Sequence, residues 1–225
     1  MSFRLFGFPI SLRGSFFMVL GLLGYTQFPN QLELAVAFVA IGVVAITVHE
    51  LGHAFAARAK GTVGTPTISM EGMSGLTRYR LQEVPSRATS IFISFAGPLA
   101  GLVSGGILLA VARSGVIERT SLNDSLINIG LFTTIGWSVL NLLPIVPLDG
   151  GHILAELLPG DRPSRTRKAA MISIAVAVVA AIWVFVQFRA IFGVLILGML
   201  AAQNMSLLSA SKNKAMAPAV SVRDE

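Results

Sequence analysis

Long apolar runs separated by short polar segments dominate this sequence. A helix needs about 20 mainly apolar residues to cross the hydrocarbon layer of a membrane, so runs of this length predict membrane-spanning helices. We expect six spans, at about 14–31, 32–59, 88–112, 125–148, 169–188 and 190–211. The pattern therefore predicts an all-α polytopic membrane protein, with one integral-membrane domain over residues 1–211.

Two segments interrupt the helical pattern. Residues 61–84 contain four glycines together with β-favouring threonine and isoleucine, which favours a small hairpin-like insert after the second span; a plain cytosolic loop is the alternative. Pro144 and Pro147 cannot both lie in a regular helix, so the chain is expected to be extended there. At membrane depth such backbone is tolerated only inside protein or beside a water-filled cavity, which is where we expect Asp149. The polar residues 212–225 are predicted to form a disordered tail.

The composition agrees with a membrane protein. Hydrophobic residues make up 54% of the chain and charged residues 12%, whereas a soluble domain has about 25% charged residues. The absence of cysteine excludes disulfides and thiolate metal ligands.

The net charge of +6 is compatible with nucleic-acid binding, but the positions of the basic residues argue against it. With six spans and a cytosolic N-terminus, all the Lys and Arg residues except Arg113, Arg119 and Arg189 fall on the cytosolic side, as the positive-inside rule requires. We therefore predict a multi-pass protein of the cell membrane, with both termini cytosolic, the lipid bilayer as its surroundings and no nucleic-acid partner.

Three ionisable residues stand together near the end of the second span. His49, Glu50 and His53 follow a stretch, residues 34–48, that carries no charge. Ionisable groups within a membrane helix are costly to desolvate and usually functional. Residues four apart share a helix face, so the two histidines can bind one metal ion, while Glu50 can take a proton from water as a general base. The alternative is a packed histidine pair with Glu50 as its hydrogen-bond partner.

A catalytic zinc usually has three protein ligands, so one more is needed. The candidates are Asp149, His152, Glu156, Glu71 and Glu83. Asp149 is the carboxylate nearest the predicted depth of the histidines, and the glycines that follow it allow a sharp bend. Helix capping is the alternative role for Asp149, and His152 could instead support the site from behind the ligands. Asn141 could donate to a substrate or a developing oxyanion, or simply bond between helices.

These residues resemble the site-2 proteases, a family of intramembrane zinc metalloproteases. The resemblance is carried by His49-Glu50-Leu51-Gly52-His53 on the second span and by Asn141-x-x-Pro144-x-x-Pro147-Leu148-Asp149-Gly150-Gly151 on a later one. It implies one Zn²⁺ per chain, held by His49, His53 and Asp149, with Glu50 as the base.

The resemblance also implies roles in substrate binding. The insert would pair with an extended substrate, and Gly72, Gly75, Asn141 and Pro144 would bind it or support the transition state. The insert reads Glu71-Gly72-Met73-Ser74-Gly75, where family members commonly have adjacent glycines, and we see no PDZ or CBS domain, so the chain looks like a compact member.

The function that this resemblance implies is regulated intramembrane proteolysis, the hydrolysis of peptide bonds in or near the transmembrane segments of membrane-tethered substrates. Two other functions use the same residues. A metal-binding transporter would need a polar path through the outer half of the bundle, which looks uniformly apolar. An inactive relative that only binds substrates is disfavoured by the complete set of His49, Glu50, His53 and Asp149. The sequence specifies neither the substrate nor an oligomeric state.

Overall fold

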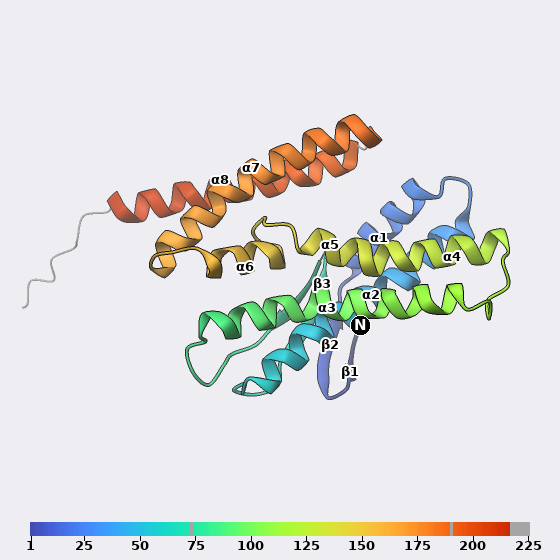
Figure 1. The fold of residues 1–225 in the computed structure, drawn as a ribbon, viewed down its shortest axis with the longest axis horizontal. Helices are drawn as coiled ribbons and strands as arrows, with labels where there is room; N and C mark the ends of the chain where they lie inside the picture. The colour runs from blue at the N-terminus through green and yellow to red at the C-terminus, as the bar shows by residue number, and fades with distance from the viewer. Residues whose placement is uncertain (73, 190, 217–225) are drawn as a thin grey trace, which may run out of the picture. The chain divides into compact units, whose positions relative to one another are not determined.

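The computed structural model describes residues 1–72, 74–189 and 191–216 (Figure 1). These form two compact units, residues 1–142 and residues 143 onward.

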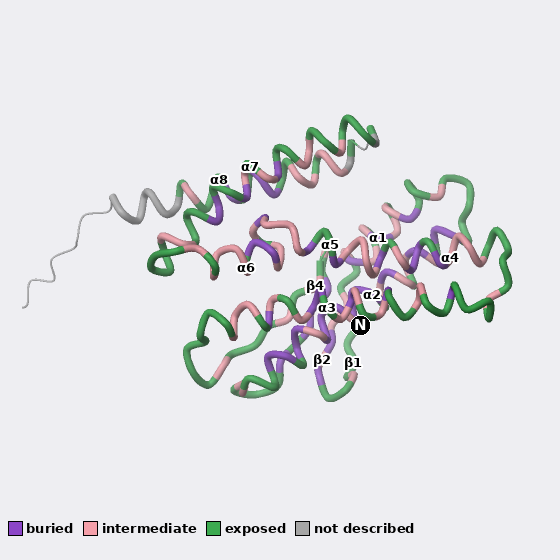
Figure 2. Tube along the Cα trace, in the orientation of Figure 1, coloured by how far each residue is buried: buried purple, intermediate pink, exposed green. Residues whose placement is uncertain are grey.

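The first unit is built around the helix that carries the two histidines, α2. Its helices are α1 (Gly14–Gln27), α2 (Leu32–Ala59), α3 (Arg87–Arg113), α4 (Ser121–Leu131), the π-helical turn η1 (Phe132–Gly136) and α5 (Trp137–Asn141). The central helix α2 packs against α1, α3 and α4. Figure 2 shows that buried residues concentrate along α2 and in strand β2. Protein on several sides of α2 explains how a membrane-length helix can carry ionisable groups.

A four-stranded sheet lies in the same unit. Its strands are β1 (Ser2–Leu5), β2 (Phe8–Leu12), β3 (Thr67–Glu71) and β4 (Ser74–Arg78), in that spatial order. The outer pairs are antiparallel, and β2 runs parallel to β3 with Ile10 opposite Ile68. The predicted hairpin after the second span is thus confirmed as β3–β4, but the N-terminal residues extend it into a larger sheet.

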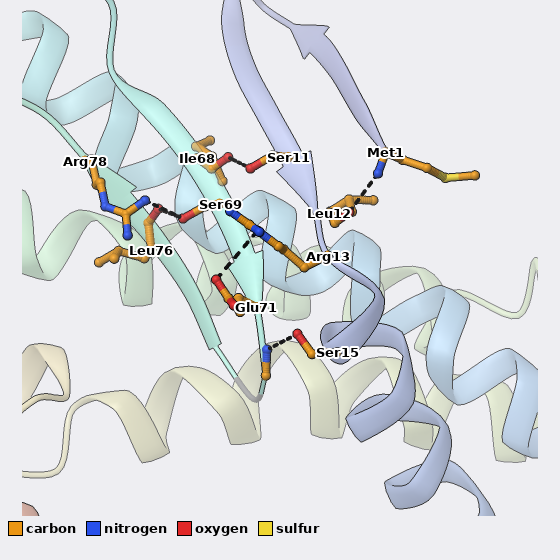
Figure 3. A network of polar contacts seen from close by, with 11 residues as sticks. Met1, Ser11, Leu12, Arg13, Ser15, Ile68, Ser69, Glu71, Leu76 and Arg78 are labelled. Atoms are coloured by element: carbon orange, nitrogen blue, oxygen red, sulfur yellow. Dashed lines mark hydrogen bonds and ion pairs between the residues drawn. The ribbon is translucent and has the colours of Figure 1, made fainter.

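Alternating burial along the strands attaches this sheet to α2. Ile68 and Met70 on β3 are buried, together with Phe8 and Ile10 on β2, and all four share a core with Leu51 of α2. At the end of β3, Glu71 pairs with Arg13 at 3.7 Å and the Gly72 N–H donates to Ser15 Oγ at 3.2 Å (Figure 3). The sheet is therefore held to α2 by its apolar face and to the start of α1 by polar contacts.

The second unit consists of α6 (Asp149–Leu157), α7 (Arg162–Phe188) and α8 (Ile191–Met216). Helices α7 and α8 pack on each other, and α6 packs on α7. Helix α7 begins earlier than the span predicted from residue 169, because Asp161 caps it by accepting from the Ser164 N–H at 3.3 Å. Helix α8 continues into the predicted tail as far as Met216, and residues 217–225 lie outside the described part.

Three helices of the described chain are long and apolar enough to cross a membrane: residues 32–59, 87–113 and 162–187. The first predicted span forms a helix of only 14 residues, α1. The fourth predicted span is divided among α4, η1, α5 and the non-helical residues before α6. Its last residues are non-helical, as the two prolines predicted. The apolar helical stretch Gly193–Ser209 lies in the sixth. The membrane class of the fold agrees with expectation, while the count of six spans stays a prediction.

Candidate metal centre

His49 and His53 lie one helical turn apart on α2 and turn their rings toward each other. Their side chains are buried, with 3% and 8% of each residue exposed. The two Nε2 atoms are 3.2 Å apart. The shared face that the sequence spacing predicted is therefore a place where two imidazole nitrogens converge.

The protonation of His53 follows from its other ring nitrogen. Nδ1 lies 2.7 Å from the backbone carbonyl oxygen of Ile93 on α3. A carbonyl can only accept, so Nδ1 must carry the proton, which leaves a lone pair on Nε2. A bond of this kind sets the tautomer and the ring orientation of a metal-binding histidine.

A glycine of α3 makes room for this ring. A Cβ atom at Gly97 would lie 2.5 Å from Cε1 and 2.7 Å from Cδ2 of His53, and closer still to Nε2. Next to it, Pro98 lies inside α3, where it supplies no N–H. Gly97 therefore serves close packing, and the surface it packs against is the histidine itself.

Glu50 is buried beside the histidines and is covered by strand β4. Only 6% of the residue is exposed. The Thr77 hydroxyl lies 2.6 Å from Glu50 Oε2, to which it donates. A Cβ atom at Gly75 would lie 2.5 Å from Cγ and 2.6 Å from Cδ of Glu50. The hairpin that follows α2 in sequence thus returns to hold the carboxylate on that helix.

Thr77 and the Ile93 carbonyl are the two partners that sequence analysis missed. Thr77 is an ordinary strand residue within the predicted insert, and a backbone carbonyl has no sequence signature. The only available signal was the β-leaning composition around Thr77, which predicts a strand but not what it contacts.

Asp149 is the first residue of α6. The capping residue of that helix is Leu148, without a side-chain cap bond, so the helix-cap alternative for Asp149 is wrong. His49 and His53 offer two imidazole nitrogens on α2, and Asp149 offers a carboxylate at the start of α6.

The other residues considered as a third ligand are paired with arginine or exposed. Glu156 pairs with Arg165, and Glu71 pairs with Arg13. His152 and Glu83 are exposed. The choice of Asp149 as the third ligand stays a prediction.

The predicted substrate-binding residues are distributed over both units. Asn141 is the buried last residue of α5, and its Nδ2 donates to the Trp137 carbonyl at 2.9 Å. Trp137 belongs to the same helix, so the alternative of a bond between helices is wrong for this contact. Gly72 has a φ of +60° at the β3–β4 turn, a conformation that suits glycine. Pro144 lies in the non-helical segment before α6. Their contact with a substrate stays a prediction.

Comparison with known proteins shows that the chain is similar to zinc metalloproteases. Residues 116–185 match the family model of peptidase family M50, a stretch that contains Asn141 and Asp149. A zinc metalloprotease of Methanocaldococcus jannaschii is 30% identical over 161 residues, which are 69% of this chain and 44% of that protein. The solved site-2 protease from Methanocaldococcus jannaschii has the same fold, with a TM-score of 0.65 at 23% identity over 92% of this chain and 94% of that chain.

This chain spans less than half the length of the curated relatives it matches. Within that span, the resemblance to site-2 proteases predicted from the sequence motifs is confirmed by a family model, a curated relative and a shared fold.

Proposed function

We propose that this chain is a zinc metalloendopeptidase of the site-2 protease type. Its substrates would be membrane-tethered proteins, cleaved in or next to their transmembrane segments in regulated intramembrane proteolysis. Support comes from the names of the similar proteins, from the match to peptidase family M50 and from the geometry on α2. The alternatives of a transporter and an inactive relative have no comparable support.

The spacing of the two histidine nitrogens is the observation that carries the proposal. Two nitrogens bound to one tetrahedral zinc at about 2.05 Å lie about 3.3 Å apart. The Nε2 atoms of His49 and His53 are 3.2 Å apart, and the Nε2 of His53 carries a lone pair because its Nδ1 donates to Ile93. The pair therefore fits zinc in spacing, and His53 fits it in protonation as well.

The proposed ligand set is His49, His53 and Asp149. Three protein ligands of this kind leave an open position for water or substrate in catalytic zinc sites. When bound, zinc supplies a Lewis acid that polarises the scissile carbonyl and lowers the pKa of water to about 7.

Glu50 is the proposed general base. Its carboxylate takes a proton from the attacking water and later delivers it to the nitrogen of the departing amine. The Thr77 hydroxyl holds Oε2 through a bond of 2.6 Å, which leaves Oε1 as the oxygen for proton transfer. In this scheme the Asn141 amide would donate to the developing oxyanion.

The substrate would bind as an extended strand. Peptide bonds within a helix are internally hydrogen-bonded, so the substrate must first unwind locally. Strand β4 is the last strand of the sheet, and an edge strand offers N–H and carbonyl groups to an added strand. Gly75 lies on β4 next to Glu50, so a strand added at this edge would run close to the proposed base.

The proposed setting is the cell membrane, with six spans and both termini in the cytosol. His49 precedes Arg58 by nine residues on α2, which is about 14 Å along a helix. If Arg58 marks the cytosolic surface, the zinc site lies within the hydrocarbon layer and opens toward the cytosol.

The substitution Glu50→Gln tests the proposal. The purified full-length chain should keep wild-type zinc content, while cleavage of a reconstituted transmembrane substrate should fall below detection, because glutamine cannot accept the proton. Glu33→Gln is the matched control, since Glu33 lies exposed in the first turn of the same helix, and it should cleave normally. Continued cleavage by Glu50→Gln would show that Glu50 is not the base.

A further inference from the structure

The residues between α5 and α6 lack regular secondary structure, yet they immediately precede the proposed ligand Asp149. Pro144 and Pro147 have no N–H to donate. Local bonds join the Ile145 N–H to the Leu143 carbonyl and the Leu148 N–H to the Ile145 carbonyl, both at 2.7 Å. The N–H and the carbonyl of Val146 take side-chain partners from α7 and α8 instead.

Ser173 on α7 is the partner of the Val146 N–H. Its Oγ accepts from Val146 N at 2.9 Å and donates to the Ala169 carbonyl of its own helix at 2.7 Å. Ser173 has no exposed surface. The hydroxyl is therefore oriented by its own helix so that its lone pair faces Val146.

Asn204 on α8 is the partner of the Val146 carbonyl. Its Nδ2 donates to Val146 O at 2.5 Å and to the Leu200 carbonyl of α8 at 2.8 Å. Both partners are carbonyls, so the amide must present its nitrogen to them. Asn204 is fully buried as well.

Apolar packing connects the same segment to α6. Ile145 is fully buried in a core formed with Ala177, Leu200 and Ala201 of α7 and α8. A Cβ atom at Gly151, in the first turn of α6, would lie 2.6 Å from the Ile145 carbonyl oxygen. The first turn of α6 therefore rests on backbone that α7 and α8 hold in place.

A purely structural role for the two polar residues would be to join α7 to α8. The hydrogen bonds do not follow that pattern. Ser173 and Asn204 each bond to their own helix and to Val146, three residues before Asp149. Polar side chains in apolar helices are costly unless they are satisfied, and here the satisfied partner is the segment that leads to the ligand.

We propose that Ser173 and Asn204 are positioning residues for the third zinc ligand. By holding both polar groups of the Val146 backbone, they set where α6 begins and so where the Asp149 carboxylate is presented. This inference rests on the proposed function, because it takes Asp149 as a ligand. Its measurable property is zinc affinity, which can be read without any substrate.

The test is the zinc dissociation constant of the purified full-length chain, measured by competition with a chromogenic chelator. Asn204→Leu removes both donated bonds at similar volume, and Ser173→Ala removes the acceptor for Val146. We expect zinc binding to weaken about tenfold to a hundredfold, as for residues that orient metal ligands. Excess zinc should restore occupancy and cleavage, which would not follow from a general loss of folding.

Conservative and neighbouring variants complete the design. Ser173→Thr keeps a hydroxyl and should bind zinc nearly as tightly as the wild type. Gln203→Leu changes an exposed amide next to Asn204 and should have no effect. Wild-type affinity in both Asn204→Leu and Ser173→Ala, or an equal loss in Gln203→Leu, would overturn the inference. Ser173→Ala alone decides the question if Asn204→Leu does not fold.

Asp149→Ala separates this inference from the function on which it rests. If Asp149→Ala keeps wild-type zinc affinity, the proposed ligand set fails, and the positioning role fails with it. If Asp149→Ala loses zinc while Asn204→Leu and Ser173→Ala keep it, only the positioning role is overturned.

Discussion

Gly97 is the position where one added methyl group should harm the proposed metal site most directly. Its Cα lies against the imidazole of His53, and a Cβ atom there would be 2.5 Å from Cε1 and 2.7 Å from Cδ2. Comfortable contacts between carbon atoms are about 3.5–4.0 Å. The substitution Gly97→Ala therefore forces the ring or the helix to move by roughly 1 Å.

The His53 ring has little freedom to absorb such a shift. Its Nδ1 is bonded to the Ile93 carbonyl at 2.7 Å on the same helix that would carry the new methyl group. Ligand distances in a zinc site hold within about 0.2 Å, so a displacement of this size is several times too large. We expect zinc affinity to fall about a hundredfold, equivalent to about 2.7 kcal/mol.

Zinc affinity by chelator competition, with thermal unfolding measured on the same zinc-free samples, is the assay for Gly97→Ala. Gly106→Ala is the matched control, because Gly106 lies on the same helix and its Cβ would meet nothing within 4 Å. That variant should bind zinc normally and gain up to about 1 kcal/mol of helix stability. Equal zinc affinity in the two variants would refute the argument that Gly97 makes room for a ligand.

Three further predictions concern other contacts of the first unit and the metal itself. Thr77→Val keeps the side-chain shape but removes the hydrogen-bond donor to Glu50, and the loss of a bond to a charged partner costs about 1.5–3 kcal/mol. We expect kcat to fall at least tenfold with zinc content unchanged, and Thr77→Ser should restore kcat. Normal turnover by Thr77→Val would contradict the role of Thr77 in holding Glu50. Gly24→Ala would place a Cβ 2.8 Å from the Ala35 carbonyl, whereas one at Gly21 would meet nothing within 4 Å; only the first should lower the melting temperature, by the equivalent of about 1–3 kcal/mol. Chelation should also lower the melting temperature, since a metal at a hundred times its Kd adds about 2.7 kcal/mol; an unchanged melting temperature would argue against a zinc site in the folded chain.

The part of the site that could be predicted from sequence is the part that is local in the chain. His49 and His53 share a helix face because of their spacing, and Glu50 is next to one of them. Pro144 and Pro147 are three residues apart and cannot both lie in a regular helix, so the break before Asp149 was also predictable. Helical periodicity and proline geometry act over one or two turns, and they require no knowledge of the fold.

Predictions that depended on contacts between distant segments fared less well. The sequence predicted a hairpin after the second span but not its N-terminal partner, in which Ile10 lies opposite Ile68 in the same sheet. The cap role weighed for Asp149 was wrong, because Leu148 occupies that position. Pairing of strands and the start of a short helix depend on packing, which propensities describe poorly.

The sequence alone determined which residues carry the proposed chemistry and that they lie in an apolar, membrane-type helix. Only the tertiary structure decided what surrounds them: the Ile93 carbonyl that sets the tautomer of His53, the Thr77 hydroxyl on Glu50 and the side chains of Ser173 and Asn204 on Val146. The physical reason is that each of these contacts joins two segments far apart in the sequence, which packing must bring close enough for a hydrogen bond. Residue type says that such a bond can form, and packing of the helices and strands selects its partner.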